Sequence, residues 1–319
     1  MLSCAILDDY QDIAKSIADW RPLQGKVEVR AYHEHFVDRT ALAQALSGFE
    51  IVVAMRERTS FDAWLFERLP KLKLLVTTGM RNASIDLEAA ARHGVQVCGT
   101  SSSAGATAEL AWGLIHALTR DIPQEVNRFR QGGKWQVGLG RDLLGKNLGV
   151  IGLGNLGARV ARVGLAFGMH VSGWSRSLTP ERCAEIGIRH AGTLDKLLAD
   201  SDIVSLHVTL NAQSLGLIGA RELGLMRRSA YLVNTSRGPV VDEAALIQAL
   251  RTGQIAGAGI DVYADEPLAL DHPFRSLDNV IPTPHLGYVT EETYRIYYGQ
   301  AVEDISAWLA GAPVRILGK

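Results

Sequence analysis

The chain has 319 residues, of which 47% are hydrophobic and 21% are charged. These ordinary globular values exclude a small disulfide-stapled scaffold and a largely disordered chain, and the length suggests about two domains. The formal net charge of -1 gives no electrostatic footprint for nucleic acid or for an anionic membrane surface, so we expect a small-molecule partner.

Cysteine usage and the N-terminal residues predict a cytoplasmic protein. Cys4, Cys98 and Cys183 are scattered and form no CxxC motif, as expected in a reducing compartment. Asp8 and Asp9 occur before any signal-like apolar run develops, and no uncharged apolar stretch of about 18 residues follows. We therefore expect neither secretion nor a membrane span. We also expect no metal site, because no compact group of His, Cys and carboxylate residues has ligand spacing.

Short runs rich in Val, Ile and Leu alternate with longer amphipathic segments, a pattern typical of parallel strands covered by crossover helices. The first series of strands is expected near residues 5–7, 27–31, 51–54, 72–77 and 95–98. The helices between them are expected near residues 11–20, 40–46, 61–68 and 84–93. A second series of strands is expected near residues 148–152, 170–174, 203–207, 231–234 and 258–262.

Two features define the expected domain boundaries. The small polar run at 99–105 follows the first series of strands and precedes a helix expected over 103–118. A final helix is expected over 292–309, with apolar residues spaced by three and four and with Gly311 as its C-terminal stop. Because the second sheet is complete before this helix, we expect the helix to return to the first domain.

The predicted fold class is therefore α/β, with two Rossmann-like or flavodoxin-like doubly wound parallel-sheet domains and a cleft between them. Residues 1–100 plus 290–319 would form one discontinuous domain, and residues 101–289 would form the other.

A GxGxxG motif at 152–157 follows an apolar strand and opens a helix that ends near Phe167. Gly152 allows the tight turn, Gly154 lets backbone N–H groups approach a pyrophosphate, and Gly157 permits close packing of helix on strand. A merely flexible turn is the alternative. The order of strand, loop and helix favours a dinucleotide site.

The acidic residue expected about 20 positions later, which would bind the ribose 2′-OH of NAD, is missing. The strand ends instead at Ser175 and Arg176. A guanidinium suits bidentate binding of a phosphate, so NADP(H) is predicted to be favoured, with NAD(H) possible. A solvated Arg176 at a strand end is the alternative.

Three ionisable residues follow strands in the C-terminal third: Arg237, Glu266 and His285. Each taken singly has a bland interpretation as a surface charge or an ordinary histidine. Together they suit the reduction of a carbonyl by hydride, because a protonated His can donate a proton to the developing oxyanion and a carboxylate can orient the ring. The Arg supplies fixed positive charge for a substrate carboxylate and for the oxyanion.

These residues resemble the D-isomer-specific 2-hydroxyacid dehydrogenase family over nearly the whole chain. The motifs that carry the resemblance are GLGNLG at 152–157, HVTL at 207–210, LVNTSRGPVVDEAAL at 232–246, AGIDVYADEP at 258–267 and TPHLG at 283–287. The resemblance implies that Arg237, Glu266 and His285 are catalytic and that Asp261 holds the nicotinamide carboxamide. It also implies a homodimer formed through the cofactor domain by a dimerisation arm near 120–145, which includes Trp135, and a discontinuous substrate domain.

The glycine motif and the resemblance together give a set of expected cofactor-binding residues, namely Gly152, Gly154, Asn155, Leu156, Gly157, Ser175, Arg176, His207, Thr209, Thr235 and Asp261. The expected substrate-binding residues are Met80, Arg81, Arg237 and His285.

The sequence departs from the family at some of these positions. Arg81 replaces a glycine of the substrate loop, where it would recognise a second polar or anionic group or turn to solvent, and Thr209 stands where Pro is frequent. Arg56 is a weaker pocket candidate, and Tyr288 either reaches the site or packs in the core.

The resulting hypothesis is an NAD(P)-dependent oxidoreductase that interconverts a 2-keto acid and a D-2-hydroxy acid, with the two domains closing over the ligands to exclude water. One alternative is the same fold acting on another anion, such as phosphite or 3-phosphoglycerate, although the chain lacks the extra C-terminal regulatory domain of many phosphoglycerate dehydrogenases. Another is a dinucleotide-sensing corepressor without turnover. The substrate side chain is left open: glyoxylate and hydroxypyruvate are small and polar, whereas Met80 and Trp135 would suit a larger apolar acid.

Overall fold

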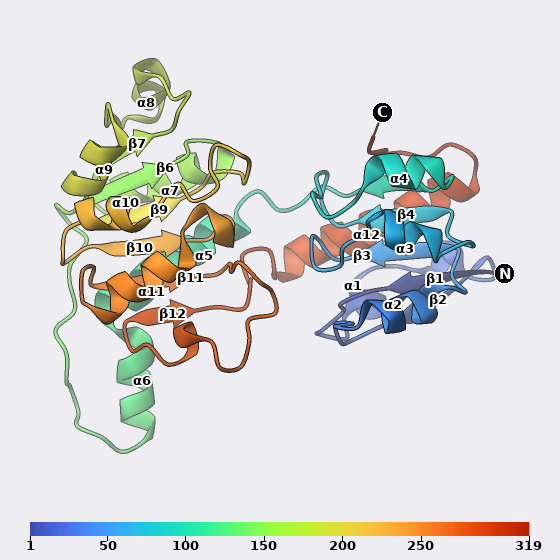
Figure 1. Ribbon diagram of the computed structural model, residues 1–319, viewed down its shortest axis with the longest axis horizontal. Coiled ribbons are helices and arrows are strands. Elements are labelled where there is room, and N and C mark those ends of the chain that lie inside the picture. The colour runs from blue at the N-terminus through green and yellow to red at the C-terminus, as the bar shows by residue number, and fades with distance from the viewer. Residues whose placement is uncertain (319) are drawn as a thin grey trace. The chain divides into compact units, whose positions relative to one another are not determined.

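The computed structural model describes residues 1–318, and residue 319, the last of the predicted 290–319 segment, lies outside the described residues (Figure 1). The chain forms two compact units, one of Met1–Ser103 with the segment from Val289 onward and the other of Ala104–Tyr288. Each unit contains one sheet in which every strand pair is parallel. The predicted class, two doubly wound parallel-sheet α/β domains, is confirmed.

The first unit is built on a five-stranded sheet with the flavodoxin-like order β2-β1-β3-β4-β5. Its strands are β1 (Leu2–Ile6), β2 (Val27–Ala31), β3 (Ile51–Ala54), β4 (Leu74–Thr77) and β5 (Gln96–Gly99). One face is covered by α2 (Arg39–Leu46), α3 (Ala63–Glu67) and α4 (Leu87–Arg92). A second group of helices packs together and against β4 and β5, and comprises α1 (Ala14–Ile17), the short 3₁₀ helix η1 (Arg21–Leu23) and α12 (Glu291–Leu309).

The C-terminal segment after α12 is attached to the edge strand of this sheet. Gly99 N–H donates to the Arg315 carbonyl at 3.0 Å, and Leu317 N–H donates to the Val97 carbonyl at 2.9 Å. The Arg315 guanidinium also reaches the fully buried Asp304 carboxylate of α12 at 2.9 Å. The segment thus covers the otherwise unpaired side of β5.

The second unit is built on a seven-stranded sheet with the order β12-β11-β10-β9-β6-β7-β8. Its strands are β6 (Asn147–Ile151), β7 (His170–Trp174), β8 (Arg189–His190), β9 (Ile203–Leu206), β10 (Tyr231–Asn234), β11 (Gly257–Ile260) and β12 (Val280–Pro282). The chain leaves β6 toward β7 and later returns to its other side with β9. This reversal of direction between β6 and β9 is the topological switch point where open α/β sheets bind ligands.

Helices enclose an apolar core on each face of the second sheet. One core involves α5 (Ala106–Arg120), α7 (Asn155–Ala166) and α8 (Pro180–Ile186). The other involves α9 (Leu194–Asp200), α10 (Ala220–Leu225), α11 (Glu243–Arg251) and the 3₁₀ helices η2 (Gly238–Val240) and η3 (Pro273–Arg275). The remaining helix, α6 (Ile122–Arg130), buries none of its residues.

Several predicted boundaries were wrong for local reasons. The helix predicted over 11–20 is only α1, because the Asp9 carboxylate accepts the N–H groups of Ile13 and Ala14 and so fixes the start of the helix. The helix predicted from 61 starts at Ala63, because Phe61 forms a β-bridge. The two strands β8 and β12 were not among the predicted ones.

Among residues 1–318, every helix is too short or too polar to cross a lipid bilayer. Cys4, Cys98 and Cys183 are free and buried.

Candidate active site

The glycine loop between β6 and α7 has close contacts at its first and third glycines and open space at its second. Gly152 has a φ of +92°, and a Cβ there would lie 2.5 Å from the His207 carbonyl oxygen. A Cβ on Gly157 would lie 1.9 Å from the Gly152 carbonyl oxygen, whereas a Cβ on Gly154 would have no neighbour within 4 Å. The first and third glycines are therefore required by packing, and the second leaves open space at the start of α7.

His207 follows β9, on the other side of the switch point from the glycine loop. Its N–H donates to the Ile151 carbonyl at 2.7 Å, and its Nε2 lies 2.8 Å from Ser205 Oγ. Burial lowers the pKa of His207 to about 4, so the imidazole is neutral at physiological pH. His207 is therefore a polar, uncharged group at the switch point, opposite the glycine loop.

A buried hydroxyl supports a ligand at the carboxyl edge of this sheet. Thr235 follows β10 and is 6% exposed, and its Oγ1 has no hydrogen-bond partner among the residues that the structure describes. Buried hydroxyls normally find a partner, so an orphaned one at a strand end fits a site completed by a ligand. Together with the open space at Gly154, it fits a bound nicotinamide dinucleotide.

Ser175 and Arg176 lie where β7 ends, with Ser175 half-buried and Arg176 exposed. The Arg176 guanidinium donates to the Gln213 carbonyl at 2.9 Å, which holds it over the loop that follows β9. The hydrogen bond to Gln213 thus fixes the orientation of the Arg176 guanidinium.

Arg237, Glu266 and His285 follow three neighbouring strands, β10, β11 and β12. His285 Nδ1 lies 2.6 Å from one Glu266 carboxylate oxygen, and the other carboxylate oxygen accepts the Tyr263 N–H at 3.0 Å. Arg237 is half-buried and donates to the Ser236 carbonyl at 2.7 Å. The structure brings His285 and Glu266 into direct contact, with Glu266 fixed from both sides.

Asp261, which the resemblance assigns to the nicotinamide carboxamide, follows β11 and accepts hydrogen bonds from the protein. Its side chain is fully buried, and its carboxylate accepts hydrogen bonds from Thr283 Oγ1 at 2.6 Å, Leu286 N–H at 2.7 Å and Gly287 N–H at 2.9 Å. Burial raises its pKa, and these hydrogen bonds oppose the rise. Asp261 therefore anchors the segment that carries His285, which itself has a left-handed backbone with φ of +53°.

The predicted substrate loop belongs to the first unit and follows β4. Gly79 has a φ of +111°, Met80 is 43% exposed and Arg81 is exposed. Arg56, which follows β3, donates to the Thr78 carbonyl at 3.3 Å, and its guanidinium lies where a Cβ on Gly79 would be, only 2.0 Å away. Arg56 thus packs on the loop itself.

The other predicted residues occupy varied positions. Asn155 and Thr209 are exposed and Leu156 is half-buried. Tyr288 is 8% exposed, and its ring meets the His285 imidazole edge-on at 5.2 Å between centroids. Trp135 is 77% exposed and contacts Phe129 of α6.

The predicted site residues did not include Tyr263, Glu243 or His272, which lie around the Glu266 loop. Tyr263 binds Glu266 through its backbone, and its hydroxyl donates to the Thr283 carbonyl at 2.8 Å. Glu243 lies 3.0 Å from His272. The Tyr263 contact uses the backbone, and Glu243 and His272 are 29 residues apart, so neither interaction leaves a local pattern in the sequence. Glu243 does lie within the motif at 232–246, and His272 follows the motif at 258–267 by five residues.

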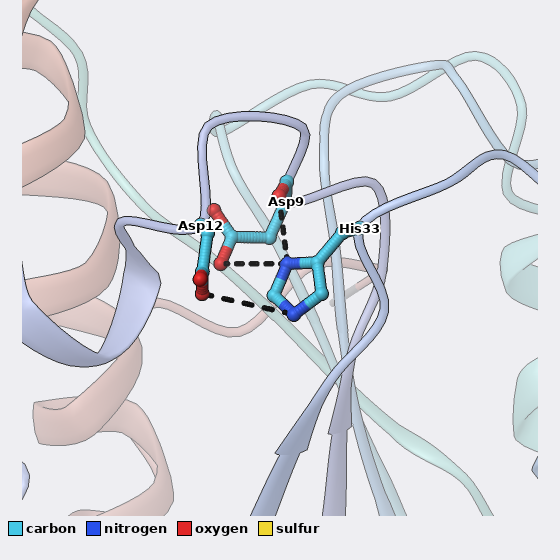
Figure 2. A group of neighbouring side chains, drawn as sticks. All are labelled: Asp9, Asp12 and His33. Carbon is cyan, nitrogen blue, oxygen red and sulfur yellow. Dashed lines mark hydrogen bonds and ion pairs between the residues drawn. The ribbon is translucent and has the colours of Figure 1, made fainter.

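One further cluster, of Asp9, Asp12 and His33, lies in the first unit (Figure 2). His33 Nδ1 lies 3.1 Å from the Asp9 carbonyl and its Nε2 lies 3.6 Å from Asp12. The sequence spacing gave no hint of this group, because pairing of β1 with β2 brings it together. The Asp9 carboxylate already accepts the N–H groups at the start of α1, so helix capping accounts for its position.

The second unit thus combines a Rossmann strand order, a glycine loop at the switch point and a carboxylate–histidine pair at the same edge of the sheet. These features define a dinucleotide-dependent oxidoreductase.

Comparison with known proteins specifies the family. Residues 112–287 match the family described as D-isomer specific 2-hydroxyacid dehydrogenase, NAD binding domain. A glyoxylate reductase from Aeropyrum pernix is 37% identical over 85% of this chain and 83% of its own length. A D-3-phosphoglycerate dehydrogenase from Archaeoglobus fulgidus is 36% identical over 88% of this chain, but only 53% of its own length is covered. The crystal structure of a phosphoglycerate oxidoreductase from Vibrio cholerae has a TM-score of 0.94 and 36% identity, over 98% of this chain and all of the other.

The chain belongs to the D-isomer-specific 2-hydroxyacid dehydrogenase family, as the resemblance predicted. It is therefore an oxidoreductase that transfers a hydride between a nicotinamide dinucleotide and a 2-keto acid or D-2-hydroxy acid.

Proposed function

We propose that the chain reduces a small, polar 2-keto acid to the D-2-hydroxy acid, with NADPH as the favoured cofactor. Arg237 binds the substrate carboxylate and polarises the carbonyl, His285 donates the proton, and Glu266 orients His285. The hydrogen bond between His285 and Glu266, at the same carboxyl edge of the sheet as the glycine loop, carries the proposal.

The contacts of His285 assign its two nitrogens. With Nδ1–H donating to Glu266, the proton exchanged with substrate is held at Nε2. Glu266 holds the imidazole ring in one orientation through this hydrogen bond. The half-buried Arg237 provides a fixed positive charge, which stabilises the negative charge that develops on the carbonyl oxygen.

The dinucleotide supplies the hydride when it is bound. Gly152, Gly154 and Gly157 provide the loop for its pyrophosphate, with Asn155 and Leu156 at the start of α7. The remaining polar residues of the proposed cofactor site are the neutral His207, Thr209 and Thr235, whose buried hydroxyl has no partner among the described residues. Asp261 acts through the His285 segment, and a contact to the carboxamide remains a prediction.

The choice of substrate rests on the relatives. Three relatives named glyoxylate reductase are 37%, 38% and 41% identical to this chain, whereas two D-3-phosphoglycerate dehydrogenases and the phosphoglycerate oxidoreductase structure are each 36% identical. We therefore propose glyoxylate and hydroxypyruvate ahead of 3-phosphoglycerate. Met80 and Arg81 remain the proposed substrate contacts of the first unit.

A panel of 2-keto acids, assayed with NADPH and NADH by the loss of cofactor absorbance, tests this proposal. Glyoxylate or hydroxypyruvate should give the largest kcat/KM, and the product should be the D isomer. Cofactor binding without turnover on any acid would instead support a dinucleotide-sensing corepressor, and preference for phosphite or 3-phosphoglycerate would contradict the substrate class.

The NADPH preference depends on Arg176, because a carboxylate is absent from the end of β7 and a guanidinium is present. Arg176→Ala should reduce the ratio of kcat/KM for NADPH to that for NADH by about tenfold or more, through loss of a charge-assisted phosphate contact. An unchanged ratio would remove Arg176 from this role.

We further propose a homodimer formed through α6 and the residues up to 145. The exposed apolar side chains of this arm support it, namely Ile122, Val126, Phe129, Trp135, Val137, Leu139 and Leu144. Large apolar groups exposed in one region are typical of a protein interface. Light scattering of the wild type and of Phe129→Glu should show a dimer and a monomer, respectively.

A cytoplasmic location remains a proposal that the three free cysteines support.

A further inference from the structure

A second carboxylate–histidine pair, Glu243 with His272, lies at the base of the loop that carries Glu266. Glu243 is the first residue of α11, and one of its carboxylate oxygens lies 3.0 Å from His272 Nε2. The other oxygen accepts the Ala264 N–H at 3.4 Å. The pair therefore joins α11 to both ends of the exposed segment 264–271.

The contacts of His272 assign the tautomer of its neutral ring. Its Nδ1 accepts the Phe274 N–H at 3.2 Å and so caps η3, which requires a lone pair on that nitrogen. The proton of the neutral ring is then on Nε2, from which it is donated to Glu243. Both nitrogens are engaged, and the side chain is only 16% exposed, so His272 is held in one orientation.

Glu243 and Glu266 accept hydrogen bonds from adjacent backbone amides. Tyr263 N–H donates to Glu266, and Ala264 N–H donates to Glu243. The peptide that joins Tyr263 and Ala264 also presses on Gly238, where a Cβ would lie 2.0 Å from the Tyr263 carbonyl carbon and 2.6 Å from the Ala264 nitrogen. One peptide thus links the loop of Arg237, the loop of Glu266 and the Glu243–His272 pair.

We propose that Glu243 and His272 are positioning residues that hold the 264–271 loop so that Glu266 stays hydrogen-bonded to His285. The inference rests on the proposed roles of Glu266 and His285. Its physical basis is that Glu266 lies on an exposed segment, and that a proton donor loses rate steeply when its geometry relaxes.

The test compares substitutions that separate the two functions of His272. His272→Asn keeps an acceptor for the Phe274 N–H but is too short to reach Glu243, whereas His272→Gln places an amide N–H near the position of Nε2. We expect His272→Asn and Glu243→Ala to lower kcat about tenfold, with a shifted pH profile of kcat and little change in NADPH affinity. His272→Gln should restore most of the rate.

A matched control is Glu185→Gln on α8, which breaks an exposed ion pair with Arg182 at the other edge of the sheet. It should retain the wild-type kcat and pH profile. Thermal unfolding of each variant shows whether the protein is folded during the assay.

A double-mutant cycle with Glu266→Gln tests whether Glu243 acts through Glu266. If it does, adding Glu243→Ala to Glu266→Gln lowers kcat no further. Additive losses, or a wild-type pH profile in both His272→Asn and Glu243→Ala, would overturn the positioning role. Full activity in Glu266→Gln itself would instead refute the proposed function.

Discussion

The turn that follows the first strand of each sheet has the same topological place but opposite chemistry. After β6, the sequence GLGNLG leaves open space around Gly154 at the start of α7. After β1, the chain carries Asp8 and Asp9, and the Asp9 carboxylate accepts the N–H groups of Ile13 and Ala14 at the start of α1. Helix N-termini bind negative charge, either from a side chain or from a phosphate. The first sheet supplies its own anion, and the second leaves the place to a ligand.

Each sheet also has a carboxylate–histidine pair at its carboxyl edge. In the first unit, His35 lies 2.9 Å from Asp8, which is 2% exposed and also accepts from Thr59. The hydrogen bond to Asp8 raises the pKa of His35. In the second unit, the Glu266–His285 pair lies on the sheet that has the glycine loop. The second sheet combines such a pair with a glycine loop, whereas the turn after β1 carries carboxylates, so we expect catalysis at the Glu266–His285 pair and none at the Asp8–His35 pair.

The largest expected effect is on kcat, and it should distinguish the Glu266–His285 pair from the Asp8–His35 pair. His285→Ala should lower kcat by about 10²- to 10⁴-fold, because it removes the proposed proton donor, while NADPH affinity stays nearly intact. Steady-state kinetics and a fluorescence titration with NADPH check this. His35→Ala is the matched variant in the first unit and should leave kcat close to that of the wild type. Equal losses in both variants would contradict the distinction.

Gly154→Asp would place a carboxylate in the turn after β6, as Asp9 does in the turn after β1. The backbone of Gly154 is extended, with φ of -73°, and a Cβ there meets no neighbour, so the fold should tolerate the change. A carboxylate at this position should cap α7 and repel the pyrophosphate, lowering NADPH affinity about 100-fold without lowering Tm. Gly154→Ala is the uncharged control and should bind more tightly than the Asp variant. Unchanged affinity in Gly154→Asp would place the cofactor elsewhere.

Stability should depend on pH through Asp304 of the first unit. Burial raises the pKa of this carboxyl to about 7, and Arg315 only partly opposes the rise. Because the folded state holds the proton more tightly than the unfolded state, this contribution to the free energy of unfolding is complete below about pH 4. It is lost as the pH rises to about 7, by about 4 kcal/mol. Urea unfolding across this range measures the loss, and Asp304→Asn should flatten the profile; an equally steep profile in that variant would contradict the assignment.

The smallest effect concerns the cap of α1. Asp9→Ala should lower the free energy of unfolding by about 1 kcal/mol, because it leaves the N–H groups of Ile13 and Ala14 without their acceptor. Differential scanning calorimetry would show this as a small decrease in Tm. Asp9→Asn keeps an acceptor and should lie between the wild type and the Ala variant. An unchanged Tm in Asp9→Ala would mean that water replaces the cap without loss.

Local patterns predicted the strands and the long terminal helix well. The helix predicted over 292–309 is α12, because Thr290 caps it and its apolar spacing is regular. The helix predicted over 11–20 failed because the Asp9 side chain, not apolar spacing, determines where α1 begins. The two-residue strand β8 is too short to give a periodic signal.

The candidate site was predictable where it lies within motifs, and less so where it depends on tertiary contacts. Arg237, Glu266 and His285 were identified from their positions after strands and from the family resemblance. The hydrogen bonds of Asp261 to the His285 segment, and of Glu243 to His272, join residues 22 to 29 positions apart. Such contacts depend on the order of strands in the sheet, which no single segment specifies.

Gly238 has a consequence for how this sequence can vary during evolution. A methyl group there would collide with the Tyr263–Ala264 peptide, so every residue except glycine should be selected against. Asp265 and Leu270 are exposed on the 264–271 loop and make no described contact with Gly238 or with the Tyr263–Ala264 peptide. Substitutions at these two positions should therefore be tolerated. In a library of variants at Gly238, Asp265 and Leu270 that is selected for enzyme activity, we therefore expect many residue types at 265 and 270 but only glycine at 238.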